Sequence, residues 1–126
     1  SDYLPHNYTH NCVVYTGTHD NDTVMGWYDT LKGADKKLCD DYLRLKNADG
    51  EPIPREQLPW EFVRAAMSSV ADLAIIPMQD YLGLGSEARI NIPSTLGINW
   101  KWRMGNGDFT KELAGRIRSM TKLYGR

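Results

Sequence analysis

The sequence predicts an α/β protein that is rich in helix and contains about two parallel strands. Two observations support this prediction. Short apolar runs at residues 12–16 and 73–76 have the length and composition of buried strands, and helical patterns follow the strands, as in a βαβα unit. Two parallel strands alone leave their faces uncovered. We therefore expect the 126 residues to belong to a larger parallel sheet rather than to a helix-rich domain with a small sheet of its own.

A run of polar residues separates the first strand from the helix that follows it. Residues 1–11 are polar and predict a loop before the strand. A helix is predicted over 23–31, with Gly33 at its end. The candidates for capping the first amides of this helix are Asp20, Asn21 and Asp22.

Two more helices are predicted in the middle of the chain, over 34–46 and 60–70, because apolar residues recur there at helical spacing. Residues 47–59 contain a glycine and three prolines and predict the loop between them. The apolar faces consist of Leu38, Tyr42 and Leu45 in the first helix, and of Phe62, Val63, Ala66, Met67 and Val70 in the second.

The last part of the chain contains a strand, a long loop and a helix. Pro77 stops the strand at 73–76. Residues 78–103 are rich in glycine, proline and asparagine and predict a loop with short turns. A final helix is predicted over 108–124, with one apolar face made of Leu113, Ile117, Met120 and Leu123.

The composition argues against several classes of function. The formal net charge is −1, which gives no electrostatic reason for binding nucleic acid or an anionic membrane. The longest apolar runs are too short to cross a bilayer. Ser1–Tyr8 lacks the apolar core of a secretory signal, and Cys12 and Cys39 are too few for a disulfide scaffold. We therefore expect a cytoplasmic protein, with Cys12 as a small core residue.

Metal and nucleotide sites are not expected from the motifs present. His6, His10, His19 and Cys12 do not have the spacing of a zinc site, and no close second cysteine accompanies Cys12. Residues 83–88 fit the spacing of a dinucleotide-binding fingerprint, but other residues separate them from the preceding strand. We expect neither a metal nor an organic cofactor.

Four stretches of the sequence resemble a known family. They are LPHNY at residues 4–8, VVYTGTHDNDTVMGWY at 13–28, IIPMQDYLGLGSEARINIP at 75–93 and GINWKWR at 97–103. Together they resemble the C-terminal part of the 4-α-glucanotransferases, also called amylomaltases or disproportionating enzymes. The resemblance implies that residues 1–126 are the C-terminal portion of an α-amylase-like (β/α)8 TIM barrel and include its last two strands. It is weakest over 32–58, which is interpreted as a variable surface insertion.

The resemblance also implies an activity. The family transfers glucosyl chains between α-1,4-glucans and maltooligosaccharides by a retaining double displacement, without a cofactor. Asp20 would stabilise the transition state, and His19 would bind the same sugar. The residues implied as further sugar contacts are Gln79, Asp80 and Asn91. No stretch matches the family's nucleophile or acid/base. We therefore expect both to lie in the remainder of the barrel, and the isolated chain to be inactive and to self-associate.

Other interpretations of these residues stay open. The run Thr18–Asp22 is also typical of a helix N-terminus with several capping groups, and Asp22 fits that role better than a sugar contact. Asp80 could cap a turn, and Asn91 could bind loop backbone. For the whole chain, the alternative is a stand-alone carbohydrate-binding or interaction module. Such a module should expose no apolar strand edge and no large apolar patch.

Overall fold

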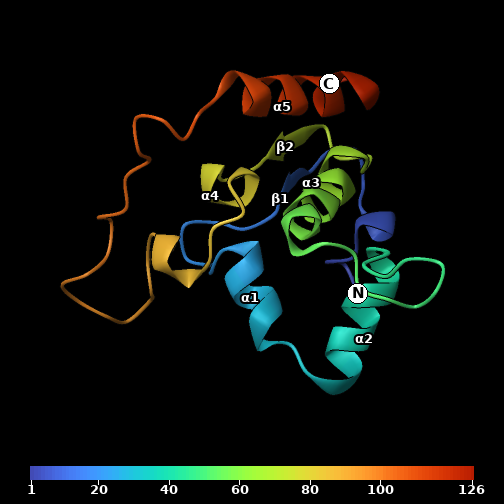
Figure 1. Cartoon of the computed structure of the whole chain (residues 1–126), viewed down its shortest axis with the longest axis horizontal. Coiled ribbons are helices and arrows are strands. Elements are labelled where there is room, and N and C mark those ends of the chain that lie inside the picture. Colours follow the sequence, from blue (N-terminus) through green and yellow to red (C-terminus); the bar gives the residue numbers. More distant parts are fainter.

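The computed structural model describes residues 1–126 and contains two short parallel strands and five α-helices (Figure 1). Strand β1 spans Val13–Tyr15 and strand β2 spans Leu73–Ile75. They pair with Val14 opposite Ala74. The predicted α/β class, with two parallel strands at these positions, is confirmed.

Four of the five α-helices follow the predicted order, whereas the short helix at Met78–Tyr81 lies in the stretch predicted as a loop; a long loop precedes the last helix. Figure 1 shows this loop, residues 89–110, running along one side of the molecule before the chain returns to the last helix. The α-helices are α1 (Val24–Thr30), α2 (Gly33–Tyr42), α3 (Leu58–Met67), α4 (Met78–Tyr81) and α5 (Lys111–Leu123). Three 3-10 turns complete the set: η1 (Pro5–Asn7), η2 (Arg55–Gln57) and η3 (Ser86–Ala88).

The start of α1 is capped by a different residue from those predicted. The hydroxyl of Thr23 accepts the N–H of Gly26 at 3.1 Å, so Thr23 is the N-cap. The predicted caps at positions 20–22 all precede it. The N–H of Val24 is bound by the distant carboxylate of Asp80, at 2.9 Å. Tertiary structure therefore supplies the second capping group.

Helix α2 is shorter than predicted and has a different inner face. Gly33 begins this helix, with φ of 55°, instead of ending α1. The helix ends at Tyr42, so Leu45 lies beyond it and is nevertheless 1% exposed in the core. Leu38, predicted on the apolar face, is 57% exposed.

Helix α3 supplies buried side chains to all three hydrophobic clusters of the protein. Figure 1 shows α3 next to the strands and α5 along the top of the view. The clusters are Val24, Met25, Cys39, Leu45 and Leu58; Trp60, Val63, Met67 and Met120; and Val14, Ala66 and Ala71. Cys39 and Leu45 belong to the first, so part of the segment 32–58 is core. Its sequence variability stays a prediction. Cys12 is half-buried beside the third cluster.

One face of the small sheet is uncovered. Val14 points toward α3 and is 4% exposed. The side chains of the opposite face, Val13, Tyr15, Leu73 and Ile75, are 42, 46, 52 and 44% exposed. Each strand also has only one neighbour, so both outer edges lack backbone partners. The sheet is open on one face and at both edges.

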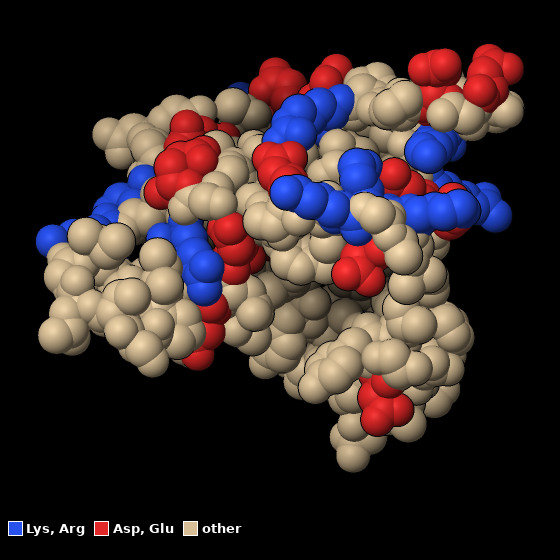
Figure 2. Space-filling model, turned by 90° about the horizontal axis from the view of Figure 1, so that it is seen from below, with Lys and Arg blue, Asp and Glu red and all other residues tan.

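The charged surface shows no segregation of sign on the face seen from below. Figure 2 shows basic and acidic side chains interleaved there, with an uncharged region beside them. None of the helices combines the length and the apolar character needed to span a membrane.

The open sheet face predicts that the isolated chain self-associates. Sedimentation velocity across a range of concentrations should show assemblies that grow with concentration, because association covers the apolar strand side chains. Leu73→Glu should weaken this association. Leu123→Glu, on an exposed position of α5, is the matched control and should not. A chain that stays monomeric over the whole range would contradict the prediction and favour the stand-alone module.

Candidate functional site

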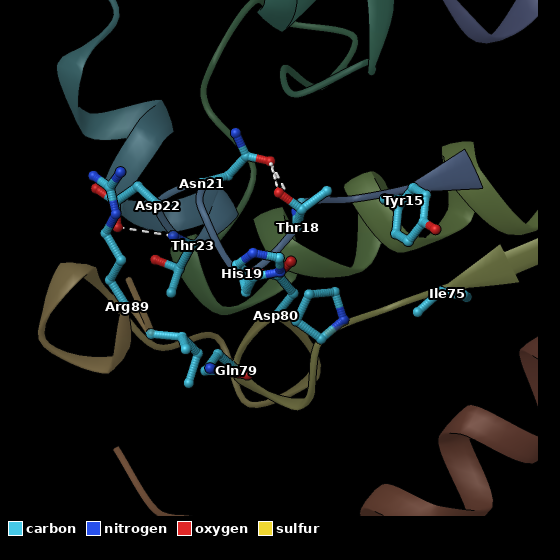
Figure 3. A pocket seen from close by; sticks show the side chains of 13 residues that line it. Tyr15, Thr18, His19, Asn21, Asp22, Thr23, Ile75, Gln79, Asp80 and Arg89 are labelled. Carbon is cyan, nitrogen blue, oxygen red and sulfur yellow. Dashed lines mark hydrogen bonds between the residues drawn. The ribbon is translucent and has the colours of Figure 1, made fainter. Parts of the chain in front are cut away.

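A surface hollow of about 370 Å³ lies at the C-terminal ends of the two strands. Figure 3 shows its side chains coming from the last residues of β1 and β2, Tyr15 and Ile75, and from the segments that follow the two strands. Parallel strands end at the same edge of a sheet, so these two polar segments meet although they are far apart in sequence. The lining includes Tyr15, Thr18, His19, Asn21, Asp22, Thr23, Ile75, Gln79, Asp80 and Arg89.

Asp80 closes the base of the loop 17–23, which we call the acidic loop. Its Oδ2 accepts the hydroxyl of Thr16 at 2.6 Å, just before the loop, and its Oδ1 accepts the N–H of Val24, just after it. The residue is 1% exposed. Burial raises the pKa of Asp80 above its ordinary value of 3.8. The two hydrogen bonds act in the opposite direction, and the nearby charge of Asp22 raises the pKa further.

Asp22 connects the acidic loop to the 3-10 turn η3. Its Oδ2 accepts the hydroxyl of Ser86 at 2.6 Å, and its Oδ1 accepts the N–H of Thr23 at 2.8 Å. This contact requires a glycine at position 26, where an added Cβ would lie 2.6 Å from the Asp22 carboxylate and collide with Ser86. The start of α1 is thereby fixed against the segment that follows β2.

The tip of the acidic loop, His19–Asp20, is bound by residues 89–91. Arg89 donates from Nη2 to the main-chain oxygen of Asp20 at 2.7 Å. Asn91 donates from Nδ2 to Asp20 Oδ1 at 2.7 Å, and its main-chain N–H donates to the oxygen of His19 at 3.1 Å. His19 Nε2 lies 3.3 Å from the same Oδ1. The Oδ2 atom of Asp20 has no partner within the chain, and the Asp20 side chain is 49% exposed.

Trp100 packs against His19 from the long loop. The two rings are 5.1 Å apart between centroids and tilted by 36°. The main-chain N–H of Trp100 donates to the main-chain oxygen of Ile90 at 2.7 Å. This bond holds the middle of the long loop against its beginning. Trp100 has φ of 63°, an unusual backbone conformation for a bulky residue. The position of the Trp100 ring beside His19 therefore depends on how residues 90–100 fold.

The structure brings the predicted site residues together in two groups. His19, Gln79 and Asp80 line the hollow, while Asp20 and Asn91 bind each other beside it. Both oxygens of Asp80 are occupied by protein donors, and the buried amide of Gln79 donates to the oxygen of Ala88 at 3.1 Å. A sugar contact by Gln79 or Asp80 stays a prediction, and these contacts give it no support.

Two residues of the site lie in stretches that resemble the family but were not predicted as site residues. Thr16 was assigned only to the end of a strand, and Arg89 only to a loop. Thr16 is 64 residues from its partner Asp80, and Arg89 is 69 residues from its partner Asp20. Local pattern does not report such long-range pairing. No group of three or more His, Cys, Asp or Glu side chains is placed to hold a metal ion.

A sequence model of the 4-alpha-glucanotransferases matches residues 1–109. The chain belongs to the 4-alpha-glucanotransferase family. A 4-alpha-glucanotransferase from Clostridium butyricum is 50% identical over 125 residues, which are 98% of this chain and 24% of that protein. A chloroplastic/amyloplastic 4-alpha-glucanotransferase from Arabidopsis thaliana is 46% identical over 127 residues, which are 98% of this chain and 21% of that protein. The family resemblance of the sequence is confirmed.

A solved 4-alpha-glucanotransferase structure has the same fold over the whole chain. Amylomaltase from Streptococcus agalactiae, in complex with acarbose, superposes with a TM-score of 0.89 at 34% identity. The match covers 100% of this chain and 24% of that one. The chain therefore spans between a fifth and a quarter of the length of these family members.

The contacts of Asp80 predict that two substitutions of this residue differ in their effect on the free energy of unfolding. Asp80→Ala leaves the buried N–H of Val24 without a partner and should lower the free energy of unfolding by about 1–3 kcal/mol. Asp80→Asn should cost little, because the amide can accept from Val24 and donate to Thr16 Oγ1. Asp72→Ala, at an exposed aspartate, is the matched control and should be neutral. Urea denaturation followed by circular dichroism measures all three.

The raised pKa of Asp80 also predicts a pH dependence. The folded chain binds this proton more tightly than the unfolded chain, so the ionised carboxylate opposes folding. The stability of the wild type relative to Asp80→Asn should be greatest below pH 3.8 and should fall as the pH rises through the folded-state pKa. The raised pKa of Asp80 would be contradicted if the difference in unfolding free energy between the wild type and Asp80→Asn were constant from pH 3 to pH 8 or rose with pH.

Proposed function

We propose that the chain forms part of the catalytic (β/α)8 barrel of a 4-α-glucanotransferase, and that Asp20 is its transition-state-stabilising carboxylate. The observation that carries this proposal is the position of Asp20. It follows the C-terminal end of a parallel strand, where barrel enzymes place functional residues. It is half exposed, and its Oδ2 is unoccupied by any group of the chain.

The proposed reaction moves a glucosyl chain from one α-1,4-glucan to the 4-hydroxyl of another. A nucleophilic carboxylate and an acid/base carboxylate, about 5 Å apart in retaining enzymes, form and then resolve a covalent intermediate. We assign both to the remainder of the barrel. Asp20 Oδ2 would accept hydrogen bonds from ring hydroxyls of the glucose at the cleavage point. These bonds strengthen as the ring approaches the oxocarbenium-like transition state.

His19 would contact the same sugar from the adjacent position. Its side chain is 56% exposed, and its ring lies between Asp20 and Trp100. An imidazole can donate to or accept from a hydroxyl. The Streptococcus agalactiae relative was solved in complex with acarbose, which supports a carbohydrate ligand for this family fold. We propose α-1,4-glucans and maltooligosaccharides as the substrates.

The open sheet supports membership of a larger barrel. A second hollow, of about 450 Å³, lies against β1 and the helices and is lined mostly by apolar side chains, among them Val14, Trp27, Leu38 and Phe62. Neighbouring strands and helices of a barrel would cover this hollow and the exposed sheet face. A stand-alone carbohydrate-binding module should expose neither an open sheet face nor an apolar hollow, so these two features favour the barrel over the module.

The proposed role of Asp20 predicts a large loss of rate on substitution. The test uses a hybrid enzyme in which this chain replaces the matching segment of the Clostridium butyricum relative, to which it is 50% identical. Asp20→Asn should lower kcat for maltooligosaccharide disproportionation by on the order of 10³-fold, because a neutral amide is a weaker hydrogen-bond acceptor for the ring hydroxyls than a carboxylate. The exposed Asp49→Asn is the matched control and should keep full activity.

The isolated chain should show no transfer activity. It would lack the nucleophile and the acid/base. Two outcomes would refute the proposal: disproportionation by the purified 126-residue chain, or near-normal turnover of the Asp20→Asn hybrid.

A further inference from the structure

We propose that Arg89 and Asn91 act as a clamp that positions Asp20, with Arg89 as the residue that holds the clamp together. The clamp itself rests only on the contacts within the chain. Its effect on catalysis rests on the role proposed for Asp20. Neither residue is required by this inference to touch the sugar.

The clamp binds the tip of the acidic loop at three points. Arg89 Nη2 reaches the main-chain oxygen of Asp20, Asn91 Nδ2 reaches its side-chain Oδ1, and the main-chain N–H of Asn91 reaches His19. Arg89 also donates from Nε to the main-chain oxygen of Asn91 at 2.9 Å. One guanidinium therefore fixes Asn91 and Asp20 relative to each other, which only the forked arginine donor set can do.

The clamp fixes the orientation of the Asp20 carboxylate by binding one of its two oxygens and leaving the other unpaired. Asn91 Nδ2 and His19 Nε2 both approach Oδ1, at 2.7 and 3.3 Å, so rotation about the last side-chain bond would break the shorter contact. Oδ2 is thereby held free for a ligand. Because the Nδ2 group and the main-chain N–H of Asn91 both donate to the tip of the acidic loop, we assign Asn91 a positioning role instead of the direct sugar contact implied by the resemblance.

The tip of the acidic loop needs the clamp because the other contacts hold only the ends of the loop, through Asp80, and its C-terminal side, through Asp22 and Ser86. Asp80 fixes residues 16 and 24, at the two ends of the loop. Between them, residues 18–21 are all exposed, so no buried side chain anchors the tip. Within the tip, Asn21 accepts from Thr18, which shapes the turn without attaching it to the rest of the protein.

Hydrogen exchange of the 126-residue chain tests the clamp without any activity measurement. Arg89→Ala should increase amide exchange in peptides covering 17–23 by on the order of tenfold, and Arg89→Lys by less, because lysine can replace only one of the two bonds. Arg103→Ala is the matched control, since Arg103 donates only to its neighbour Trp102. Peptides from α3 serve as an internal reference for global unfolding. Unchanged exchange in 17–23 for Arg89→Ala overturns the clamp.

Kinetics of the hybrid enzyme then test the effect on catalysis. Arg89→Ala and Asn91→Ala should each lower kcat by about 10- to 100-fold with little change in KM, because a displaced Asp20 loses transition-state contacts. A rise in KM at unchanged kcat for Asn91→Ala would instead support a direct sugar contact and overturn its positioning role. If Asp20→Asn abolishes turnover while Arg89→Ala does not lower kcat, the positioning role of Arg89 is wrong. If Asp20→Asn is itself harmless, the proposed function fails and the exchange result still decides the clamp.

Discussion

The buried carboxylate of Asp80 is the contact on which the candidate site depends. It follows β2, yet it binds the residues that come just before and just after the loop behind β1. The two bonds compensate for placing a charged group where it is almost completely excluded from water. Burial still raises its pKa, so this arrangement costs stability. In exchange for this cost, Asp80 fixes the distance between the two ends of the acidic loop, which carries His19 and Asp20.

The site is a product of strand pairing. β1 and β2 are separated by 57 intervening residues, from position 16 to position 72, and they pair in parallel so that both end at the same edge. The contacts that join the two sides of the site cross between the segments that follow the strands: Thr16 with Asp80, Asp22 with Ser86, and Asp20 with Arg89 and Asn91. Helix α3 covers one face of the strands and leaves the other open. The same two strands therefore both assemble the polar edge and expose an apolar surface that a larger sheet would cover.

Much of the fold followed from the sequence because its signals are local. The strands at 13–15 and 73–75 were predicted from short apolar runs, and α3 and α5 from helical periodicity. Some errors were local, such as the cap at Thr23 and the start of α2 at Gly33, and others arose where distant residues decided the outcome. The cap of α1 is shared by Thr23 and Asp80, and Leu45 reaches the core from outside any helix. His19 and Asp20 were singled out by the polar run and the family resemblance. Arg89 lies in a stretch that resembles the family but was not singled out, because its contact with Asp20 joins two segments that are far apart in the sequence.

The sequence by itself determined the class of the protein, its family and the stretch that holds the acidic loop, because strand and helix patterns and contiguous motifs are written in neighbouring residues. Tertiary structure alone decided what each polar side chain binds. Asp80 is buried and binds both ends of the acidic loop. Asn91 donates to Asp20, and one oxygen of Asp20 is left unpaired. These roles depend on which atoms come within about 3 Å of each other. That distance is set by the pairing of strands remote in sequence, which no local pattern encodes.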